Sequence, residues 1–293
     1  MKQGEPRTGP PSLRRYVLGV ANEKERGRWN DERWTSAWPK REALTSAVSP
    51  YLLNAVAALP GHRVIDVGCG GGGISISVAR SVGSGGRVVG VDISTALLEL
   101  ARARATEARL DNLTFVRADM QTDDIDGRPF DLAVSQFGVM FFDEPVTAFA
   151  SILHQLREGG RLVFAAWQEV ERNPWHIGTA LQPVVPPPRA PQPGKSMTGP
   201  FTLGDIAQTS VLLERAGFTD VTATPFEVIT RAPASAIVDR SLFTFMGVRP
   251  EQMDEASAIT QRHLDRFRVD DDEFDFPLAF NVVGATVAPA PPV

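Results

Sequence analysis

Short apolar runs alternate with amphipathic stretches along most of the chain after residue 60. Apolar runs bounded by turn residues predict buried strands, and apolar residues three and four positions apart predict helices. The predicted strands are residues 64–67, 87–91, 113–118, 130–135, 162–167, 221–229 and 276–287. The predicted helices are residues 74–82, 95–108, 145–156 and 203–216, and residues 232–268 are mostly helical. Strands that alternate with helices predict βαβ units, and therefore an α/β fold with a parallel, doubly wound sheet.

Polar residues and prolines stand where these helices are predicted to begin, and glycines stand where one of them is predicted to end. Such residues satisfy the backbone groups that have no partner within the helix. The signals are Ser49 with Pro50 before a helix over 49–59, Asp143 before 145–156, Gly159 and Gly160 after it, and a Thr202–Asp205 capping box before 203–216.

Two stretches depart from the alternation. Residues 13–59 are compatible with helices and contain Trp29, Trp34 and Trp38. Residues 183–200 are rich in proline, which neither a helix interior nor a central strand tolerates. We interpret this second stretch as a surface lid beside a pocket, because a helix and a strand resume directly after it; a plain linker is the alternative.

Composition excludes several classes of protein. The 293 residues are 43% hydrophobic and 22% charged, which suits a packed core rather than a disordered chain. No apolar run is long enough to span a bilayer, the N-terminus lacks a signal-peptide core, and one cysteine cannot form an internal disulfide. These features predict a cytoplasmic protein without a membrane span. A net charge of −5 disfavours a nucleic-acid partner.

The most informative segment is the glycine-rich stretch VIDVGCGGGG at residues 64–73. It fits the dinucleotide pattern GxGxxG through Gly68, Gly70 and Gly73. It also fits DxGxGxG through Asp66, Gly68, Gly70 and Gly72. Absent Cβ atoms would let the backbone of this loop lie against a cofactor in either case.

Charge distinguishes the two patterns. A dinucleotide places a pyrophosphate over the helix N-terminus, where the carboxylate of Asp66 would repel it. S-adenosylmethionine has no phosphate, and its sulfonium and ammonium groups are cations that a carboxylate stabilises. The loop also lacks the Lys-Ser/Thr end of a phosphate-binding P-loop. The sequence therefore favours S-adenosylmethionine, with S-adenosylhomocysteine as the product.

Two more acids end the next two predicted strands. Asp92 follows the glycine loop by about 20 residues, the distance at which a carboxylate accepts ribose hydroxyls. Asp119 ends the third strand and is placed to accept the adenine amino group. A single acid at a strand end is often only a cap, but three at successive strand ends indicate a ligand-binding edge. The adenine contacts expected beside them are Ile93, Leu97 and Met120.

These motifs resemble the class I S-adenosylmethionine-dependent methyltransferases. The likeness is to the small-molecule branch, which includes ubiquinone, menaquinone and natural-product methyltransferases, and it covers roughly residues 60–230. The segments that carry it are VIDVGCGGGG (64–73), VVGVDIS (88–94), FVRADM (115–120), FDLAVSQFGVMFF (130–142), LREGGRLVFAAW (156–167) and FTLGDIAQTSVLLERAGFTDV (201–221).

The resemblance implies a Rossmann-like seven-stranded sheet whose last strand is antiparallel. It places Asp66 and the glycines at the methionine part of the cofactor, and Ser135, Gln136 and Phe137 near the sulfonium and the substrate. Cys69 lies within the loop, where the family often has a small cysteine that packs. The family also commonly covers the cofactor with an N-terminal helical segment, so one or two of Trp29, Trp34 and Trp38 are expected to close over the site.

Further aromatic residues gather where the resemblance places the substrate, and they suggest a flat or hydrophobic acceptor. At least half of them are expected to be ordinary core residues. The expected pocket residues are Trp29, Trp34, Trp38, Phe137, Phe141, Trp167, Trp175 and Phe201.

His176 is the one histidine in a loop that the family turns toward the substrate. It is the candidate general base, against the alternative of a polar loop residue or pocket wall. No cluster of His, Cys and carboxylate residues has the spacing of metal ligands, so no metal is expected.

The prediction is therefore a methyltransferase acting on a small organic acceptor by O- or C-methylation. A member repurposed for a non-methyl reaction such as a cyclisation is the first alternative, and a nicotinamide-dependent oxidoreductase is the second. A cofactor-binding partner subunit of another enzyme is the third. A homodimer is possible. We expect a helical cap over 1–60 and a methyltransferase domain over 61–293, divided into a cofactor core 61–170, a lid loop 171–200 and a substrate-side part 201–293.

Overall fold

The computed structural model describes residues 22–185, 199–238 and 240–289. The expected helical cap over 1–60 and the expected lid loop over 171–200 therefore reach beyond it, at residues 1–21 and 186–198.

Seven strands form one sheet in the order β3-β2-β1-β4-β5-β7-β6. All neighbouring pairs from β3 to β5 are parallel, and β7 runs antiparallel to both β5 and β6. The predicted fold class, including the antiparallel last strand, is confirmed. The strands are β1 (Arg63–Val67), β2 (Arg87–Asp92), β3 (Leu113–Arg117), β4 (Phe130–Gln136), β5 (Leu156–Trp167), β6 (Phe218–Ala232) and β7 (Phe274–Val287).

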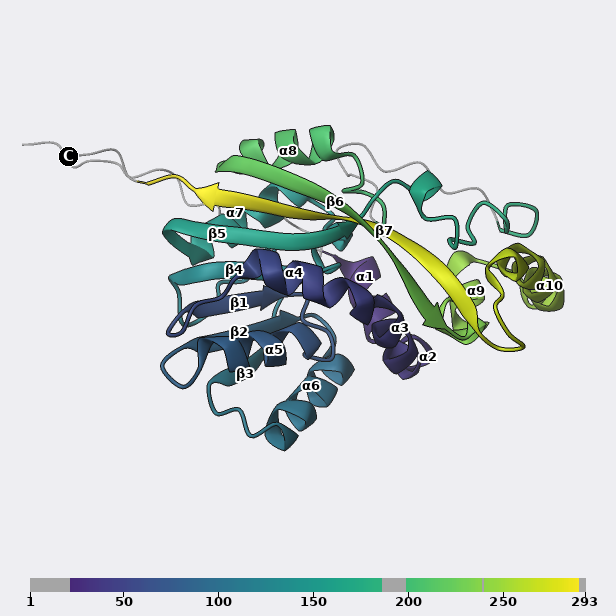
Figure 1. Cartoon of the computed structure of the whole chain (residues 1–293), viewed down its shortest axis with the longest axis horizontal. Helices are drawn as coiled ribbons and strands as arrows, with labels where there is room; N and C mark the ends of the chain where they lie inside the picture. The colour runs from purple at the N-terminus through teal and green to yellow at the C-terminus, as the bar shows by residue number, and fades with distance from the viewer. Residues whose placement is uncertain (1–21, 186–198, 239, 290–293) are drawn as a thin grey trace, which may run out of the picture.

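Helices cover both faces of this sheet (Figure 1). Helices α4 (Ser49–Val56), α5 (Gly73–Val82) and α6 (Thr95–Glu107) lie on one face, and α7 (Pro145–Gln155) and α8 (Ile206–Arg215) lie on the other. The central strands are consequently buried on both sides, which is why β1 and β2 are continuous apolar runs.

The remaining helices lie beyond the same end of the sheet (Figure 1). Three are N-terminal, α1 (Glu23–Trp29), α2 (Glu32–Ser36) and α3 (Trp38–Thr45), and two are C-terminal, α9 (Arg240–Met246) and α10 (Met253–Leu264). Trp34 of α2 packs on Phe245 of α9, with ring centroids 5.3 Å apart. The N-terminal helices thus meet helix α9 beyond this end of the sheet.

Three predicted helix caps were wrong, and in each case a side chain predicted to cap the helix has a tertiary partner instead. Ser49 lies inside a helical run that begins with a 3-10 turn at Ser46–Val48, and its hydroxyl donates to Gln136 Oε1 at 2.9 Å. Asp143 accepts from the backbone N–H of Asn22 at 3.1 Å, while Glu144 holds the N-cap position of α7 without a side-chain bond.

The predicted Thr202–Asp205 capping box is also absent. Asp205 is itself the N-cap of α8 and accepts from the backbone N–H of Gln208 at 3.1 Å. Thr202 donates instead to the carbonyl oxygen of Met140 at 2.9 Å, which joins this turn to the segment after β4.

Gly159 and Gly160 do not end helix α7, which already stops at Gln155. They lie within β5, which begins six residues earlier than the predicted 162. The β4–β5 pairing shifts register between Phe130 and Leu132, and Gly159 adopts a left-handed φ of 66° there. The glycine pair therefore accommodates an irregularity in the strand.

Candidate functional site

The glycine-rich loop lies where the strand order of the sheet reverses. The loop after β1 leads to α5 on one face, and the loop after β4 leads to α7 on the other, so the two separate at the edge where such sheets bind ligands. Gly68 has a φ of 68°, and a Cβ on it would lie 2.7 Å from the Cα of Gly138. The two loops are in direct backbone contact, which only glycine permits on both sides.

Asp66, at the end of β1, is a buried carboxylate that is only half satisfied. Its Oδ2 accepts from the hydroxyl of Ser75 at 2.5 Å, and its buried Oδ1 has no hydrogen-bond partner. Burial, with a smaller contribution from the nearby charge of Asp92, raises the pKa of Asp66 to about 7, while the Ser75 hydrogen bond acts in the opposite direction. An unpaired buried carboxylate is costly, so this one suits a cationic ligand group.

Asp92 ends β2 and faces the same loop. Its Oδ2 accepts from the backbone N–H of Gly70 and its Oδ1 from that of Ser94, both at 2.8 Å. Burial raises its pKa, while these backbone N–H groups act in the opposite direction. Each carboxylate oxygen has a second lone pair, so the residue is held in place and can still accept two hydroxyl groups.

Asp119, just after β3, contacts a helix of the N-terminal segment. Its Oδ2 accepts from Arg26 Nη2 of α1 at 3.2 Å, and its Oδ1 accepts from the backbone N–H of Gln121 at 3.0 Å. The side chain is almost fully buried. The third strand-end acid is therefore engaged by an arginine that the sequence analysis did not consider.

These acids border a cavity of about 680 Å³. That volume lies within the range of about 300–1,000 Å³ typical of small-molecule sites. The expected site residues that line it are Asp66, Gly68, Cys69, Asp92, Ile93, Leu97, Asp119, Met120, Gln136, Trp29, Trp34, Trp38, Phe137, Phe141, Trp167, Trp175 and His176.

Four expected residues lie outside the cavity wall. Ser135 is fully buried and accepts from the backbone N–H of Gly138 at 3.2 Å. Phe201 packs against the rings of His176 and Trp175. Gly70 and Gly72 belong to the glycine-rich loop and have left-handed φ values of 52° and 83°. These four support the wall and do not form it.

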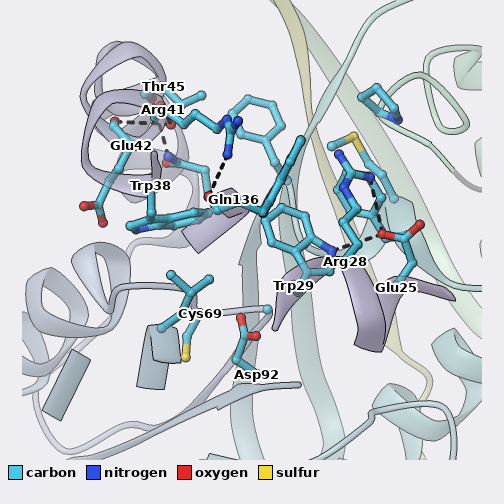
Figure 2. Close-up of a pocket in the computed structure, with 18 of the residues that line it drawn as sticks. Glu25, Arg28, Trp29, Trp38, Arg41, Glu42, Thr45, Cys69, Asp92 and Gln136 are labelled. Carbon is cyan, nitrogen blue, oxygen red and sulfur yellow. Dashed lines mark hydrogen bonds and ion pairs between the residues drawn. The ribbon is translucent and has the colours of Figure 1, made fainter. Parts of the chain in front are cut away.

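Trp38 lies directly on the glycine loop (Figure 2). A Cβ on Gly70 would collide with its indole ring, and one on Gly71 would lie 2.7 Å from its Nε1. Arg104 of α6 joins the same region, since it donates to the carbonyl oxygen of Gly71 at 2.9 Å and pairs with Glu42 of α3 at 2.7 Å. Helix α3 is thereby fixed over the loop.

Aromatic rings form the other half of the cavity. Phe137, at the end of β4, has a left-handed φ of 64°, a conformation that a bulky residue rarely adopts. Its ring stacks on Trp167 with centroids 4.0 Å apart, and Trp167 meets Trp175 edge to face at 5.3 Å. The strained backbone thus directs a flat aromatic surface into the cavity.

His176 lies on this wall and has the features of a neutral hydrogen-bond donor. Burial, with a smaller contribution from the charge of His263, lowers its pKa to about 4. The backbone N–H of Gly178 donates to Nδ1 at 3.3 Å, so the neutral ring carries its proton on Nε2. A general base would need Nε2 free of its proton.

Cys69 is buried, and burial raises the pKa of its thiol well above the ordinary value. Within the described ranges, no three His, Cys, Asp or Glu residues are grouped so that they could hold a metal ion. Among the described helices, none has the length and apolar character needed to cross a membrane.

The sequence analysis missed the charged and apolar residues that the terminal helices bring to the cavity. Arg28 and Arg41 come from α1 and α3, and Phe245 and Met246 come from α9. The ERGRW segment did carry a weak signal, because Glu25 and Arg28 are three residues apart next to Trp29. Which face of so short a helix meets the cavity depends on tertiary packing.

Comparison with known proteins agrees with this geometry. Residues 59–183 match a family model described as "Methyltransferase domain", which spans the glycine loop and all three strand-end acids. Residues 59–183 therefore form a methyltransferase domain of the class I S-adenosylmethionine-dependent kind, and the curated relatives show a likeness to the small-molecule branch.

Two curated relatives illustrate that methyltransferase branch. Aklanonic acid methyltransferase DauC of Streptomyces sp. (strain C5) is 39% identical over 106 residues, which are 36% of this chain and 48% of that protein. Nocamycin O-methyltransferase of Saccharothrix syringae is 26% identical over 196 residues, 64% of this chain and 70% of that protein. The chain thus spans about half of the first relative's length.

Among solved structures, phosphoethanolamine N-methyltransferase 2 of Haemonchus contortus in complex with S-adenosyl-L-methionine superposes with a TM-score of 0.57. It shares 15% identity and covers 90% of this chain and 60% of that one, so the likeness is one of fold.

S-adenosylmethionine is the cofactor of this methyltransferase family, and the residues present here fit it. The unpartnered Oδ1 of Asp66 suits the ammonium or sulfonium, and Gly68 and Cys69 of the loop line the same cavity as Asp66. A pyrophosphate does not fit here, since Asp66 would repel it.

Proposed function

We propose that the protein transfers the methyl group of S-adenosylmethionine to a small aromatic or hydrophobic acceptor. The observation that carries this proposal is the half-satisfied carboxylate of Asp66 beside Asp92, in a glycine loop that opens on an aromatic cavity. Asp66 and the loop glycines would hold the methionine part, Asp92 the ribose, and Asp119, Ile93, Leu97 and Met120 the adenine end.

The bound cofactor supplies an electrophilic methyl group on a sulfonium. What the protein does is alignment, because an in-line displacement is fast when nucleophile, carbon and leaving group are held on one line. Phe137, Trp167 and Trp175 would hold a flat acceptor at the end of β4. Trp38 and helix α3 cover the glycine loop and exclude water from it.

We further propose that the acceptor atom is oxygen. Of the two curated relatives, nocamycin O-methyltransferase is named for transfer to oxygen. His176, as a neutral donor, would orient an acceptor that binds as its oxygen anion, so that no proton has to be removed in the transfer step. Carbon methylation stays the alternative. Four expectations stay predictions from the sequence. They are the division of the chain at residues 60, 170 and 200, the cytoplasmic location, the absence of a nucleic-acid acceptor, and a homodimer.

The decisive experiment is calorimetric titration of the purified protein with S-adenosylmethionine, S-adenosylhomocysteine and NAD(H). Binding of the first two alone is expected. An acceptor screen then follows, read by mass gain of one methyl group. Binding of NAD(H) instead would refute the cofactor assignment. Turnover without mass gain would indicate a non-methyl reaction such as a cyclisation, and a chain that binds the cofactor but methylates nothing without a second protein would be a partner subunit.

A further inference from the structure

Arg28 of α1 is a buried guanidinium in the half of the cavity that faces away from the strand-end acids (Figure 2). Its side chain is 11% exposed. The guanidinium carbon lies 4.1 Å from the ring centre of Phe245, 4.2 Å from that of Trp34, and 5.1 Å from those of both Trp29 and Phe141. Aromatic rings thus surround the group, and cation–π contact stabilises its charge.

The hydrogen bonds of this guanidinium are incomplete. Arg28 Nη1 donates to Glu25 Oε2 at 3.3 Å, and the same oxygen also accepts from Trp29 Nε1 at 3.1 Å. Arg28 Nε is buried and has no hydrogen-bond partner. Burial lowers the pKa of Arg28 to about 10, so the group still carries its charge at neutral pH. A buried, charged donor without an acceptor is costly, and a ligand that accepts from it recovers that cost.

A second guanidinium lies on the same wall. Arg41 of α3 is 3.7 Å from the ring centre of Trp34, donates to the carbonyl oxygen of Trp34 at 2.8 Å, and lines the cavity. The ring of Trp34 thus contacts both guanidinium groups, and the charge of Arg41 contributes to lowering the pKa of Arg28.

The charges of the cavity are unevenly distributed. The strand ends bring the three acids Asp66, Asp92 and Asp119, whereas the N-terminal helices bring three cations and two acids, Lys24, Arg28, Arg41, Glu25 and Glu42. In Figure 2, Asp92 lies below, while Arg41 lies at the upper left beside Glu42 and Arg28 lies at the right beside Glu25. A cationic ligand group suits the strand-end acids and would be repelled by Arg28, so Arg28 is placed to contact the other molecule in the cavity.

We propose that the acceptor carries a carboxylate, and that Arg28, with Arg41 beside it, binds this carboxylate at the end of the cavity formed by the N-terminal helices. The inference rests on the proposed function, since it names the class of acceptor for the same site. Rings cover the guanidinium, so an acceptor reaches it at the N–H edge, and a planar carboxylate fits that edge. The aromatic wall of Phe137 and Trp167 would take the flat body of the same molecule.

The test compares acids with their neutral amides on the same ring system. Naphthalene-2-carboxylate, anthracene-2-carboxylate and anthraquinone-2-carboxylate, each paired with its carboxamide, are titrated calorimetrically into the protein at pH 8. Titrations are run with and without saturating S-adenosylhomocysteine. At least one carboxylate is expected to bind about tenfold or more tightly than its amide, the scale of a charge-assisted hydrogen bond.

Variants attribute that preference to Arg28. Arg28→Met should bring the acid and its amide to equal affinity, and Arg28→Lys should keep a reduced preference because the charge remains without the planar fork. Arg172→Met is the matched control, since Arg172 is exposed and pairs with Glu227 outside the cavity; it should keep the full preference. An unchanged affinity of Arg28→Met for S-adenosylhomocysteine shows that the site has kept its fold.

The proposal is overturned if no carboxylate in the panel binds the wild-type protein more tightly than its amide, or if Arg28→Met keeps the preference. If Arg28→Met fails to fold, the comparison of acids with amides on the wild-type protein and on Arg28→Lys still tests the proposal. Failure of the wild-type protein to bind S-adenosylhomocysteine would refute the proposed function instead, and the titrations without it would still report on Arg28.

Discussion

The affinity of the protein for its cofactor should depend on pH through Asp66. This carboxyl has one buried oxygen without a partner, and burial raises its pKa to about 7. With that pKa, about a tenth of Asp66 is ionised at pH 6 and about nine tenths at pH 8. A cationic ligand that requires the ionised form should therefore bind about tenfold more tightly at pH 8, a difference of about 1.4 kcal/mol.

The assay is calorimetric titration with S-adenosylhomocysteine at several pH values between 6 and 8, on the wild-type protein and on Asp66→Asn. The amide keeps the shape of the side chain and removes the charge. The amine of the ligand and the carboxyl of Asp92 titrate in both proteins, so the ratio of the two affinities isolates Asp66. Asp66→Asn should bind more weakly at pH 8, and the ratio should shrink about tenfold toward pH 6.

The stability of the unliganded protein should depend on pH in the opposite direction, which gives an independent check of the raised pKa. A carboxyl whose pKa is raised by folding binds its proton more tightly in the folded state than in the unfolded one. Its contribution to stability is therefore complete below the ordinary pKa of 3.8 and is lost as pH rises through about 7. An affinity ratio that stays constant from pH 6 to pH 8 would refute the assignment of Asp66 as the cation-binding group.

Three further substitutions have defined outcomes. Asp92→Ala should weaken cofactor binding by about 1–3 kcal/mol, measured by calorimetry, while Asp111→Ala at an exposed position should not; equal affinities would remove Asp92 from the ribose site. His176→Gln should lower turnover less than about tenfold without changing the pH profile between 6 and 8, and a loss of about 10²-fold together with the acidic limb of the profile would instead identify a general base. Gly138→Ala should destabilise the protein by about 1–3 kcal/mol in urea, because its Cβ would lie 2.7 Å from the carbonyl oxygen of Val67, whereas Gly85→Ala meets nothing within 4 Å and should be neutral.

The cofactor half of the site could be predicted from the sequence because it is encoded locally. Asp66, the glycines and Asp92 lie within 27 consecutive residues of alternating strand and helix, here Asp66 to Asp92. A parallel sheet brings successive strand ends to one edge, whatever the rest of the chain does. The seven-stranded order needed the family resemblance in addition, since the pairing of β7 between β5 and β6 leaves no periodic trace in the sequence.

The acceptor half could not be predicted in the same way. Arg28 and Phe245 are more than 200 positions apart in the chain and meet only in the folded protein. Phe201 and Ser135 were expected at the cavity wall and lie behind it. The sequence can place a residue in a loop or at a strand end, but it does not show whether the side chain reaches the cavity. The helix caps failed for a related reason, because Asp143 found a tertiary partner in Asn22.

Helix α1 touches both halves of the cavity within a few residues. Arg26 pairs with Asp119 at 3.2 Å, and Asn30 bridges the carbonyl oxygen of Ile93 and the backbone N–H of Thr95, while Arg28 between them faces the aromatic end. If one ligand changes the free energy of α1, the affinity of the other ligand changes too, and thermodynamic reciprocity makes the two effects equal. In the proposed site, this one short helix would therefore couple the affinity for the cofactor to the affinity for the acceptor.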